Sequence, residues 1–358
     1  MNFLPKYSLL FALKFTPLAL GMLQFINAQR VIEPNTVIIQ EGIFEVQRPL
    51  SMKMQFSIRE VKKNTNDSIY LNSLLHYQRA TEWDSIPIKI RARGNFRKQE
   101  CYYPPLKIKI KKSDAKKTIF AANRKLKMVL PCLLGGPNDD NIIKEYMAYK
   151  LYEVISPYHF KTRLADIEFD ELRGLRSKKH QLKAILLEDV DDLSKRLDAK
   201  RLKRKMHPLQ QDTLCSIRNA YFQYMIGNTD FSVRSQHNNK QYFVDQKILY
   251  IPYDFDMCGL VNASYATVSG TQNLVDNITM VTQRAYKGYQ RDIASMQQVR
   301  NEFLEHKPKL LLTMEALKLQ FEDPRQFHES KEYIMGFFEI IEDDKKFEKH
   351  IFQKGRTL

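Results

Sequence analysis

Four residues that can bind a metal ion or accept a proton stand around one short predicted hairpin. Asp230 follows the end of a predicted helix, and Asn238 stands just before the hairpin. Asp254 and Asp256 follow the hairpin directly. Residues 241–251 contain two runs of apolar residues around an Asp-Gln pair, a pattern typical of two strands joined by a tight turn. Because a short hairpin folds back on itself, both of its ends are expected to face one cleft.

This order of side chains fits phosphoryl transfer. Such enzymes use one Asp to orient the attacking hydroxyl, and an Asn and a second Asp to hold Mg²⁺ on the phosphates. Strand alternation points Asp254 and Asp256 to the same face, where two carboxylates repel each other unless a cation lies between them. A plainer interpretation stays open, in which Asp230 caps a turn, Asn238 belongs to a hairpin loop and the other two residues form an exposed acidic turn.

The first half of the chain supplies candidate phosphate ligands. Lys107, Lys109 and Lys127 lie on predicted strands. Lys127 is the favoured candidate, because its strand is more apolar and runs just ahead of a predicted helix that carries Glu145. A solvated strand face is the plainer explanation of Lys107 and Lys109.

Two further positions are candidates for nucleotide binding. Arg93-Gly94-Asn95 ends a predicted strand, and Gly94 can take a positive φ that lets the backbone approach a phosphate. Glu188 ends another predicted strand at the junction of the two halves of the chain, where a hinge is expected.

Strands dominate the first half of the sequence and helices the second. The expected strands cover residues 52–58, 86–93, 106–110, 125–130, 164–169 and 183–188. The expected helices cover residues 142–154, 213–226, 296–305, 309–321 and 330–341. Because the two types of element are segregated, the predicted fold class is α+β rather than alternating β/α.

The N-terminal residues predict export. A positively charged start, an apolar stretch over residues 7–25 and a small residue before Gln29 are typical of a signal peptide, here residues 1–28. A poorly ordered apolar helix is the alternative. Lys14 and Pro17 interrupt the apolar stretch, so no membrane span is expected to persist after signal removal. The protein is therefore expected in the periplasm or at the cell surface.

The net charge of +16 over 358 residues is high, and part of it forms a dense run. The run comprises Arg196, Lys200, Arg201, Lys203, Arg204 and Lys205. Such a run is either a solvated face or a binding surface for an acidic partner. No nucleic-acid-binding motif accompanies it, so nucleic acid is not an expected partner.

The four cysteines fit no zinc pattern. In an exported chain Cys101 and Cys132 can pair, because both flank predicted neighbouring strands. Cys215 and Cys258 are expected to be buried thiols.

The order of these motifs resembles the CotH kinase family, and most closely its secreted bacterial branch. The matching blocks are Arg93-Gly94-Asn95, Pro105-Leu106-Lys107, Lys125-Leu126-Lys127, the Glu145–Tyr149 helix, Leu187-Glu188-Asp189, Asn228-Thr229-Asp230 and Asp254-Phe255-Asp256. The similarity extends over residues 86–266 and is strongest over 228–256. Phe96-Arg97-Lys98 depart from the family, which carries small hydroxyl residues there.

The resemblance implies a two-lobed atypical protein-kinase-like fold that binds ATP and Mg²⁺ between its lobes. The strand-rich lobe is expected over residues 29–187, with one helix, and the helical lobe over 188–358. By the same likeness Asp230 is the catalytic-loop Asp and Asp254 the metal-binding Asp, with Asp256 and Asn238 as supporting ligands.

The remaining candidates complete the expected site. Lys127 and Glu145 are expected to place the phosphates. Arg93, Gly94, Asn95, Lys109 and Glu188 are expected to line the nucleotide.

Three functions follow as hypotheses. The first is an exported kinase that transfers the γ-phosphoryl group of ATP to a hydroxyl of an envelope or surface protein. The second is a catalytically inactive relative whose basic surface binds an acidic envelope polymer or protein. The third is an exported structural domain in which the aspartates only cap turns.

Overall fold

The structure is a computed structural model that describes residues 41–94, 96–135, 138–268 and 278–357. The predicted signal peptide and Asn95 lie outside the described residues. Contacts group Gln40–Leu358 into one compact unit. In the described part of the chain, no helix is long and apolar enough to cross a membrane.

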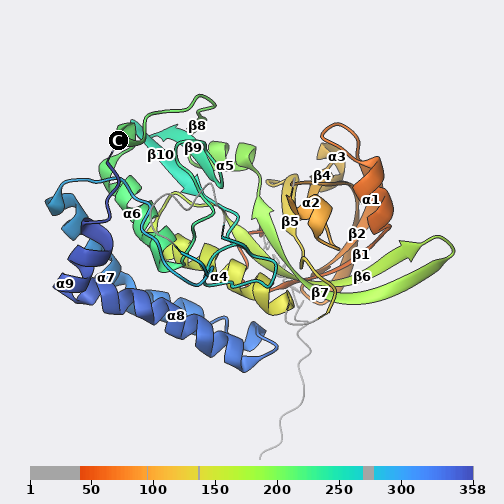
Figure 1. The fold of residues 1–358 in the computed structure, drawn as a ribbon. Helices are drawn as coiled ribbons and strands as arrows, with labels where there is room; N and C mark the ends of the chain where they lie inside the picture. Colours follow the sequence, from red (N-terminus) through yellow and green to blue (C-terminus); the bar gives the residue numbers. More distant parts are fainter. Residues whose placement is uncertain (1–40, 95, 136–137, 269–277, 358) are drawn as a thin grey trace, which may run out of the picture. The chain divides into compact units, whose positions relative to one another are not determined.

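Seven strands of the first half close into a mixed barrel (Figure 1). Its strands are β1 (Leu50–Phe56), β2 (Leu71–Arg79), β3 (Glu82–Ala92), β4 (Leu106–Ile110), β5 (Lys125–Val129), β6 (Thr162–Arg173) and β7 (Arg176–Glu188). They follow the order β1-β2-β3-β4-β5-β7-β6 around the barrel. All neighbours are antiparallel except β1 and β6, whose parallel pairing closes the barrel.

The closed barrel overturns the predicted two-lobed kinase-like fold, although the α+β class is confirmed. The closing pair sets Leu50 opposite Ala165 and Phe56 opposite Glu171, more than a hundred positions apart in the sequence. No local pattern specifies which distant strand will pair with β1. The sequence therefore predicted strands without predicting that their outer edges would meet.

Buried side chains, which alternate with more exposed ones on strands such as β1 and β4, fill the barrel. In β4, Leu106, Ile108 and Ile110 are buried, whereas Lys107 and Lys109 are only half-buried. Burying one such aliphatic side chain contributes roughly 1.5–3 kcal/mol. The hydrophobic face of each strand therefore fixes its register, since a slip by one residue would turn the lysines inward.

The helices gather mainly in the second half. They are α1 (Ile58–Asn64), α2 (Phe96–Glu100), α3 (Lys112–Ala115), α4 (Asn138–Ile155), α5 (Val190–Arg196), α6 (Thr213–Met225), α7 (Ile293–Glu315), α8 (Pro324–Glu342) and α9 (Asp344–Phe347). Short 3₁₀ turns lie at Pro208–Gln210 and Lys318–Gln320, and a π-helical turn at Glu348–Phe352. The predicted central helix is confirmed as α4, which buries Ile143, Met147 and Leu151 completely.

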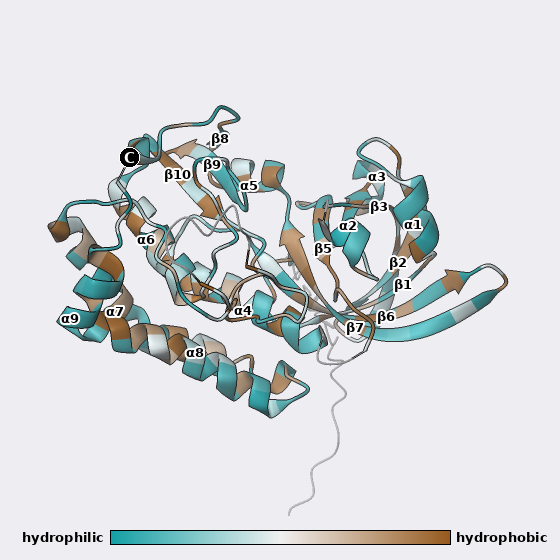
Figure 2. Cartoon of the chain, in the orientation of Figure 1, coloured by the Kyte–Doolittle hydropathy of each residue, from teal (hydrophilic) through white to brown (hydrophobic). Residues whose placement is uncertain are grey.

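Helix α4 joins the barrel to the helical half. Its buried residues form one hydrophobic cluster with Ile185 and Leu187 of β7, with Phe222 of α6 and with Phe303 of α7. Helix α8 carries one hydrophobic stripe, visible in Figure 2, and turns Phe337 and its neighbours into the same cluster. This hydrophobic cluster therefore packs beneath the loop and the hairpin that follow α6 in the sequence.

The predicted hairpin is confirmed. Strands β9 (Asn239–Val244) and β10 (Lys247–Pro252) pair antiparallel, and β8 (Lys200–Arg201) adds to the edge of β9. Asp245 and Gln246 at the turn have φ values of 48° and 60°. Positive φ at both central residues is the signature of a type I′ turn, whose twist matches that of paired strands.

A disulfide joins Cys101 and Cys132, as anticipated for an exported chain. It ties the end of α2 to the end of β5, where Tyr102 N also donates to Cys132 O at 2.7 Å. Cys258 is buried and Cys215 half-buried. Burial raises the pKa of each of these thiols to about 12.

Candidate functional site

The loop that carries Asp230 begins where α6 ends. Gly227 has a φ of 63°, and a Cβ at this position would collide with the hydroxyl of Tyr333. Glycine is therefore required both by the backbone conformation and by the close approach. Asn228 then accepts a hydrogen bond from Asp230 N at 2.9 Å and donates to Gln223 Oε1 at 2.9 Å. These bonds fix the turn that presents Asp230.

Lys287 holds the same loop from the opposite side. Its Nζ donates to Thr229 O at 2.8 Å and to Phe231 O at 3.1 Å, the residues on either side of Asp230. Burial lowers the pKa of Lys287 to about 8, with a smaller contribution from Arg356. The next residues are tied down in turn, because Arg356 N donates to Gly288 O at 2.9 Å.

The Asp230 carboxylate is oriented by two residues that precede β9. His237 Nε2 lies 3.1 Å from Asp230 Oδ1, and Asn238 Nδ2 donates to Asp230 Oδ2 at 2.9 Å. Asn238 Nδ2 also donates to Asp230 O at 2.7 Å. The hydrogen bond to Asp230 raises the pKa of His237 above its ordinary value. The Asp230–His237 pair was not anticipated from the sequence.

The open end of the hairpin brings Asn238 and Asp254 together. Tyr253 N donates to Asn238 O at 3.0 Å, and Asp254 N donates to Tyr149 Oη of α4 at 2.9 Å. Asn238 and Asp254 have φ values of 52° and 68°. This left-handed conformation is uncommon outside glycine, is tolerated best by Asn and Asp, and clusters at functional sites. The backbone thus pairs next to Asn238 and Asp254, and the shared cleft stays a prediction.

A buried acidic group lies beyond Asp254. Glu145 of α4 and Asp256 are almost fully buried, and Arg97 Nη1 lies 3.7 Å from a carboxylate oxygen of each. Burial raises the pKa of Glu145 and that of Asp256, the neighbouring carboxylates raise them further, and Arg97 opposes the rise. Tyr265 Oη donates to Asp256 Oδ2 at 3.3 Å. Arg97 also donates from Nη2 to Leu130 O at 2.8 Å.

Arg97 is a site residue that sequence reasoning missed. Its guanidinium lies between the carboxylates of Glu145 and Asp256, whereas the sequence placed a cation between Asp254 and Asp256. Its position four residues before Cys101 could have indicated that it is buried, because the disulfide holds α2 next to the end of β5. Glu145 therefore forms its ion pair with Arg97 rather than with the anticipated Lys127.

Two lysines lie near the ring of Tyr253, the residue before Asp254. Lys127 of β5 and Lys240 of β9 lie 5.1 and 4.8 Å from the ring centroid of Tyr253. Burial, followed by the charges of Arg93 and other cations, lowers the pKa of Lys127 to about 7 and that of Lys240 to about 8. Asp254 acts in the opposite direction on both lysines. Lys127 has no ion pair within 4.0 Å in the described residues.

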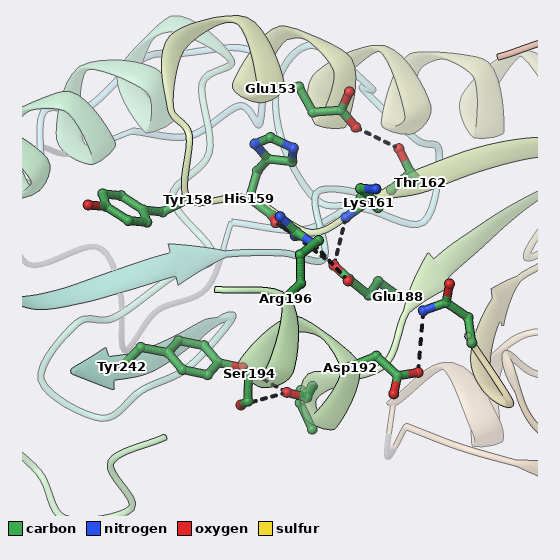
Figure 3. Close-up of polar contacts among 12 residues, drawn as sticks. Glu153, Tyr158, His159, Lys161, Thr162, Glu188, Asp192, Ser194, Arg196 and Tyr242 are labelled. Carbon is green, nitrogen blue, oxygen red and sulfur yellow. Dashed lines mark hydrogen bonds and ion pairs between the residues drawn. The ribbon is translucent and has the colours of Figure 1, made fainter. Parts of the chain in front are cut away.

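Two predicted nucleotide ligands, Lys109 and Glu188, contact other side chains of the protein. Lys109 Nζ sits 4.1 Å from the ring centroid of Tyr70. Figure 3 shows Glu188 bound by Arg196, whose Nε and Nη2 donate to its two carboxylate oxygens at 2.9 and 2.8 Å. Lys161 N adds a third bond to Glu188 at 3.1 Å. The carboxylate of Glu188 thus anchors the end of β7 to α5.

The turn after β3 is described only in part. Gly94 has a φ of 77°, the positive value that the sequence argument required. Arg93 N donates to Pro105 O at 2.9 Å, and its side chain acts electrostatically on Lys127. Asn95 lies outside the described residues.

The oxygen donors at the end of the hairpin are of the type that Mg²⁺ prefers. Asp254 and the amide oxygen of Asn238 supply them, since the Asn238 nitrogen binds Asp230. The third predicted ligand, Asp256, is buried and paired with Arg97. Within the described ranges, no group of three or more His, Cys, Asp or Glu residues is arranged to hold a metal ion. Mg²⁺ is commonly bound through one or two carboxylates, with phosphate oxygens and water completing its shell. The residues therefore fit a metal that arrives with a phosphate ligand.

No protein-family model matches this chain, and no curated protein is significantly similar to it. The likeness to the CotH kinase family thus stays a prediction from the motif order.

Proposed function

We propose that this protein transfers a phosphoryl group from ATP to a hydroxyl group of an acceptor. The observation that carries the proposal is the position of Asp254. Its carboxylate acts electrostatically on buried Lys127 and half-buried Lys240. It also acts on the buried carboxylates Glu145 and Asp256. A site in which one carboxylate lies near both cations and further carboxylates suits a polyphosphate and its accompanying metal ion.

Asp230 is the proposed group that receives the proton of the acceptor hydroxyl. The hydroxyl oxygen forms a bond to the γ-phosphorus, the bond to the bridging oxygen breaks, and ADP leaves. His237 and Asn238 orient Asp230 through the bonds already described. Mg²⁺, when bound at Asp254 and its neighbours, would neutralise charge on the phosphates.

The lysines supply the phosphate contacts in this proposal. Lys127 and Lys240 are both partly or fully removed from water, and other cations lie near them. The charged form of each lysine is therefore disfavoured unless an anion binds beside it. A phosphate between them would restore their protonation and offset the cost of burial. Arg97 forms ion pairs with the buried carboxylates of Glu145 and Asp256, which lie near Asp254.

An exported location is proposed with this activity. The Cys101–Cys132 disulfide supports it, because such bonds persist mainly in oxidising compartments. The acceptor is then a protein of the cell envelope or surface.

The test compares wild type with Asp230→Asn, using γ-labelled ATP, Mg²⁺ and protein acceptors. We expect the variant to lose at least a hundredfold in transfer while it melts within a few degrees of wild type. Asp245→Asn is the matched control, because it makes the same change at the exposed turn of the same hairpin. Equal incorporation by wild type and Asp230→Asn would remove Asp230 from the mechanism.

A further inference from the structure

Six exposed basic side chains form a strip around β8 and the loop before β9. None has a carboxylate within 4.0 Å among the residues that the structure describes, although many other cations of the chain are paired. The strip comprises Lys200, Arg201, Lys203, Arg204, Lys205 and Arg234. Arg196, the first residue of the basic run in the sequence, is excluded because Glu188 binds it. Figure 2 shows the segment around β8 as mostly hydrophilic.

The basic strip is connected to the candidate site through Gln236. Its Nε2 donates to Arg204 O at 3.1 Å and to Gln241 Oε1 at 2.9 Å. The next residue, His237, binds Asp230. On the same side, Arg201 acts electrostatically on Lys240 and on Tyr253. A segment bound along the strip would therefore lie beside Asp230.

The backbone of the strip favours an extended occupant. The three-stranded sheet has the order β10-β9-β8, so β8 is an edge strand. Leu202 N continues the pairing by donating to Gln241 O at 2.9 Å. Phe243, opposite Lys200, is 43% exposed. An open strand edge can bind an extended peptide through main-chain hydrogen bonds, and the exposed ring adds an apolar contact.

We propose that the basic strip is the docking surface for an acidic, extended segment of the acceptor protein. The proposal rests on the phosphoryl-transfer function and specifies its substrate class, a hydroxyl residue flanked by Asp or Glu. Charge complementarity favours acidic flanks over basic ones, because the six cations would repel a basic segment. The edge of β8 favours a polypeptide over a polyanion that has no amide backbone.

The experiment uses two labelled peptides that differ only in charge, one with Ser flanked by Glu and one with Ser flanked by Lys. Binding is measured by fluorescence anisotropy without nucleotide, and phosphorylation is measured separately. We expect the Glu peptide to bind at least tenfold more tightly than the Lys peptide. Its affinity should fall with added salt, because exposed charges are screened over about 8 Å at physiological ionic strength.

Lys203→Glu/Arg204→Glu/Lys205→Glu reverses half of the strip without removing the backbone carbonyls that bind Gln236. We expect it to weaken binding of the Glu peptide at least tenfold and to raise its KM more than it lowers kcat. Lys345→Glu/Lys346→Glu/Lys349→Glu is the matched control, because it makes the same charge change at exposed residues of the C-terminal turns. The control should bind the Glu peptide as wild type does.

The outcomes separate the two proposals. Transfer to both peptides with equal efficiency would overturn the docking surface and leave phosphoryl transfer standing. Specific binding of the Glu peptide without any transfer from ATP would support the strip and overturn the enzymatic proposal. Heparin, a polyanion without an amide backbone, is tested as well. If heparin binds to the strip and the Glu peptide does not bind, the strip recognises a polyanion other than a polypeptide, and the proposed acidic segment is wrong.

Discussion

The substitution Lys127→Met tests whether the buried charge of Lys127 lowers the stability of the folded protein. Lys127 is 7% exposed and has Arg93 and Lys240 as neighbouring charges. Its pKa falls from 10.5 to about 7 in the folded protein. At ~1.4 kcal/mol per pH unit, this difference corresponds to about 5 kcal/mol against the folded state while the lysine is charged. Met has a similar length and carries no charge, so the substitution removes the cost with little change in packing.

The sign of the pH dependence follows from the lowered pKa. Between about pH 7 and pH 10.5 the unfolded chain holds a proton on Lys127 that the folded protein has released. Stability therefore rises with pH across this window and carries the full cost below pH 7. The lowered pKa already includes the attraction of Asp254 and Asp189. Because repacking around Met offsets part of the gain, we expect a gain of about 2–4 kcal/mol at pH 6 and little gain at pH 10.

Urea unfolding at pH 6, 8 and 10 measures the effect. Lys107→Met is the matched control, because Lys107 lies directly opposite Lys127 across the β4–β5 pair. Lys107 forms an ion pair with buried Asp189 at 3.0 Å, so its loss should destabilise the protein, by up to ~3 kcal/mol. If Lys127→Met is less stable than wild type at pH 6, the lysine is not an uncompensated buried charge and the argument for a phosphate site there fails.

Three further results are expected. Binding of Mg-ATP at pH 8 should take up on the order of one proton, because phosphates raise the lowered pKa values of Lys127 and Lys240. Calorimetry in buffers of different ionisation enthalpy measures this uptake, and a binding enthalpy that does not depend on the buffer would contradict it. Arg97→Met should lower the free energy of unfolding by about 3–5 kcal/mol in urea titrations, since it leaves two buried carboxylates without their cation; an unchanged midpoint would show that the guanidinium is dispensable. Reduction of Cys101–Cys132, which encloses a separation of 31 residues, should cost about 4 kcal/mol in the same assay, and a loss below 1 kcal/mol would argue against the bond.

Local sequence patterns predicted the elements around the site well. The hairpin followed from two apolar runs and a two-residue turn, and its geometry brought Asn238 and Asp254 together without any long-range information. Helix α4 followed from its 3.6-residue period. Such features depend on neighbours in the sequence, so one chain is enough to reveal them.

Features that depend on distant pairing were not predictable in the same way. Barrel closure needs β1 to meet β6, and neither strand encodes its partner. The partner of Lys109 is a further example: Lys109 lies opposite Lys125, two residues further along β4 than the pair Lys107 and Lys127. Two residues of strand span about 7 Å, and the amine of Lys109 lies over the ring of Tyr70. Arg97 and Lys240 escaped notice because the burial of a cation is set by tertiary packing.

The support of the Asp230 loop reaches the carboxyl-terminal residues of the described chain. Arg356 pairs with the segment next to Lys287, through Arg356 N to Gly288 O at 2.9 Å and Gln290 N to Arg356 O at 3.0 Å. Lys287 in turn holds the two carbonyls that flank Asp230. Displacement of the segment around Arg356 would therefore release the support of the Asp230 loop.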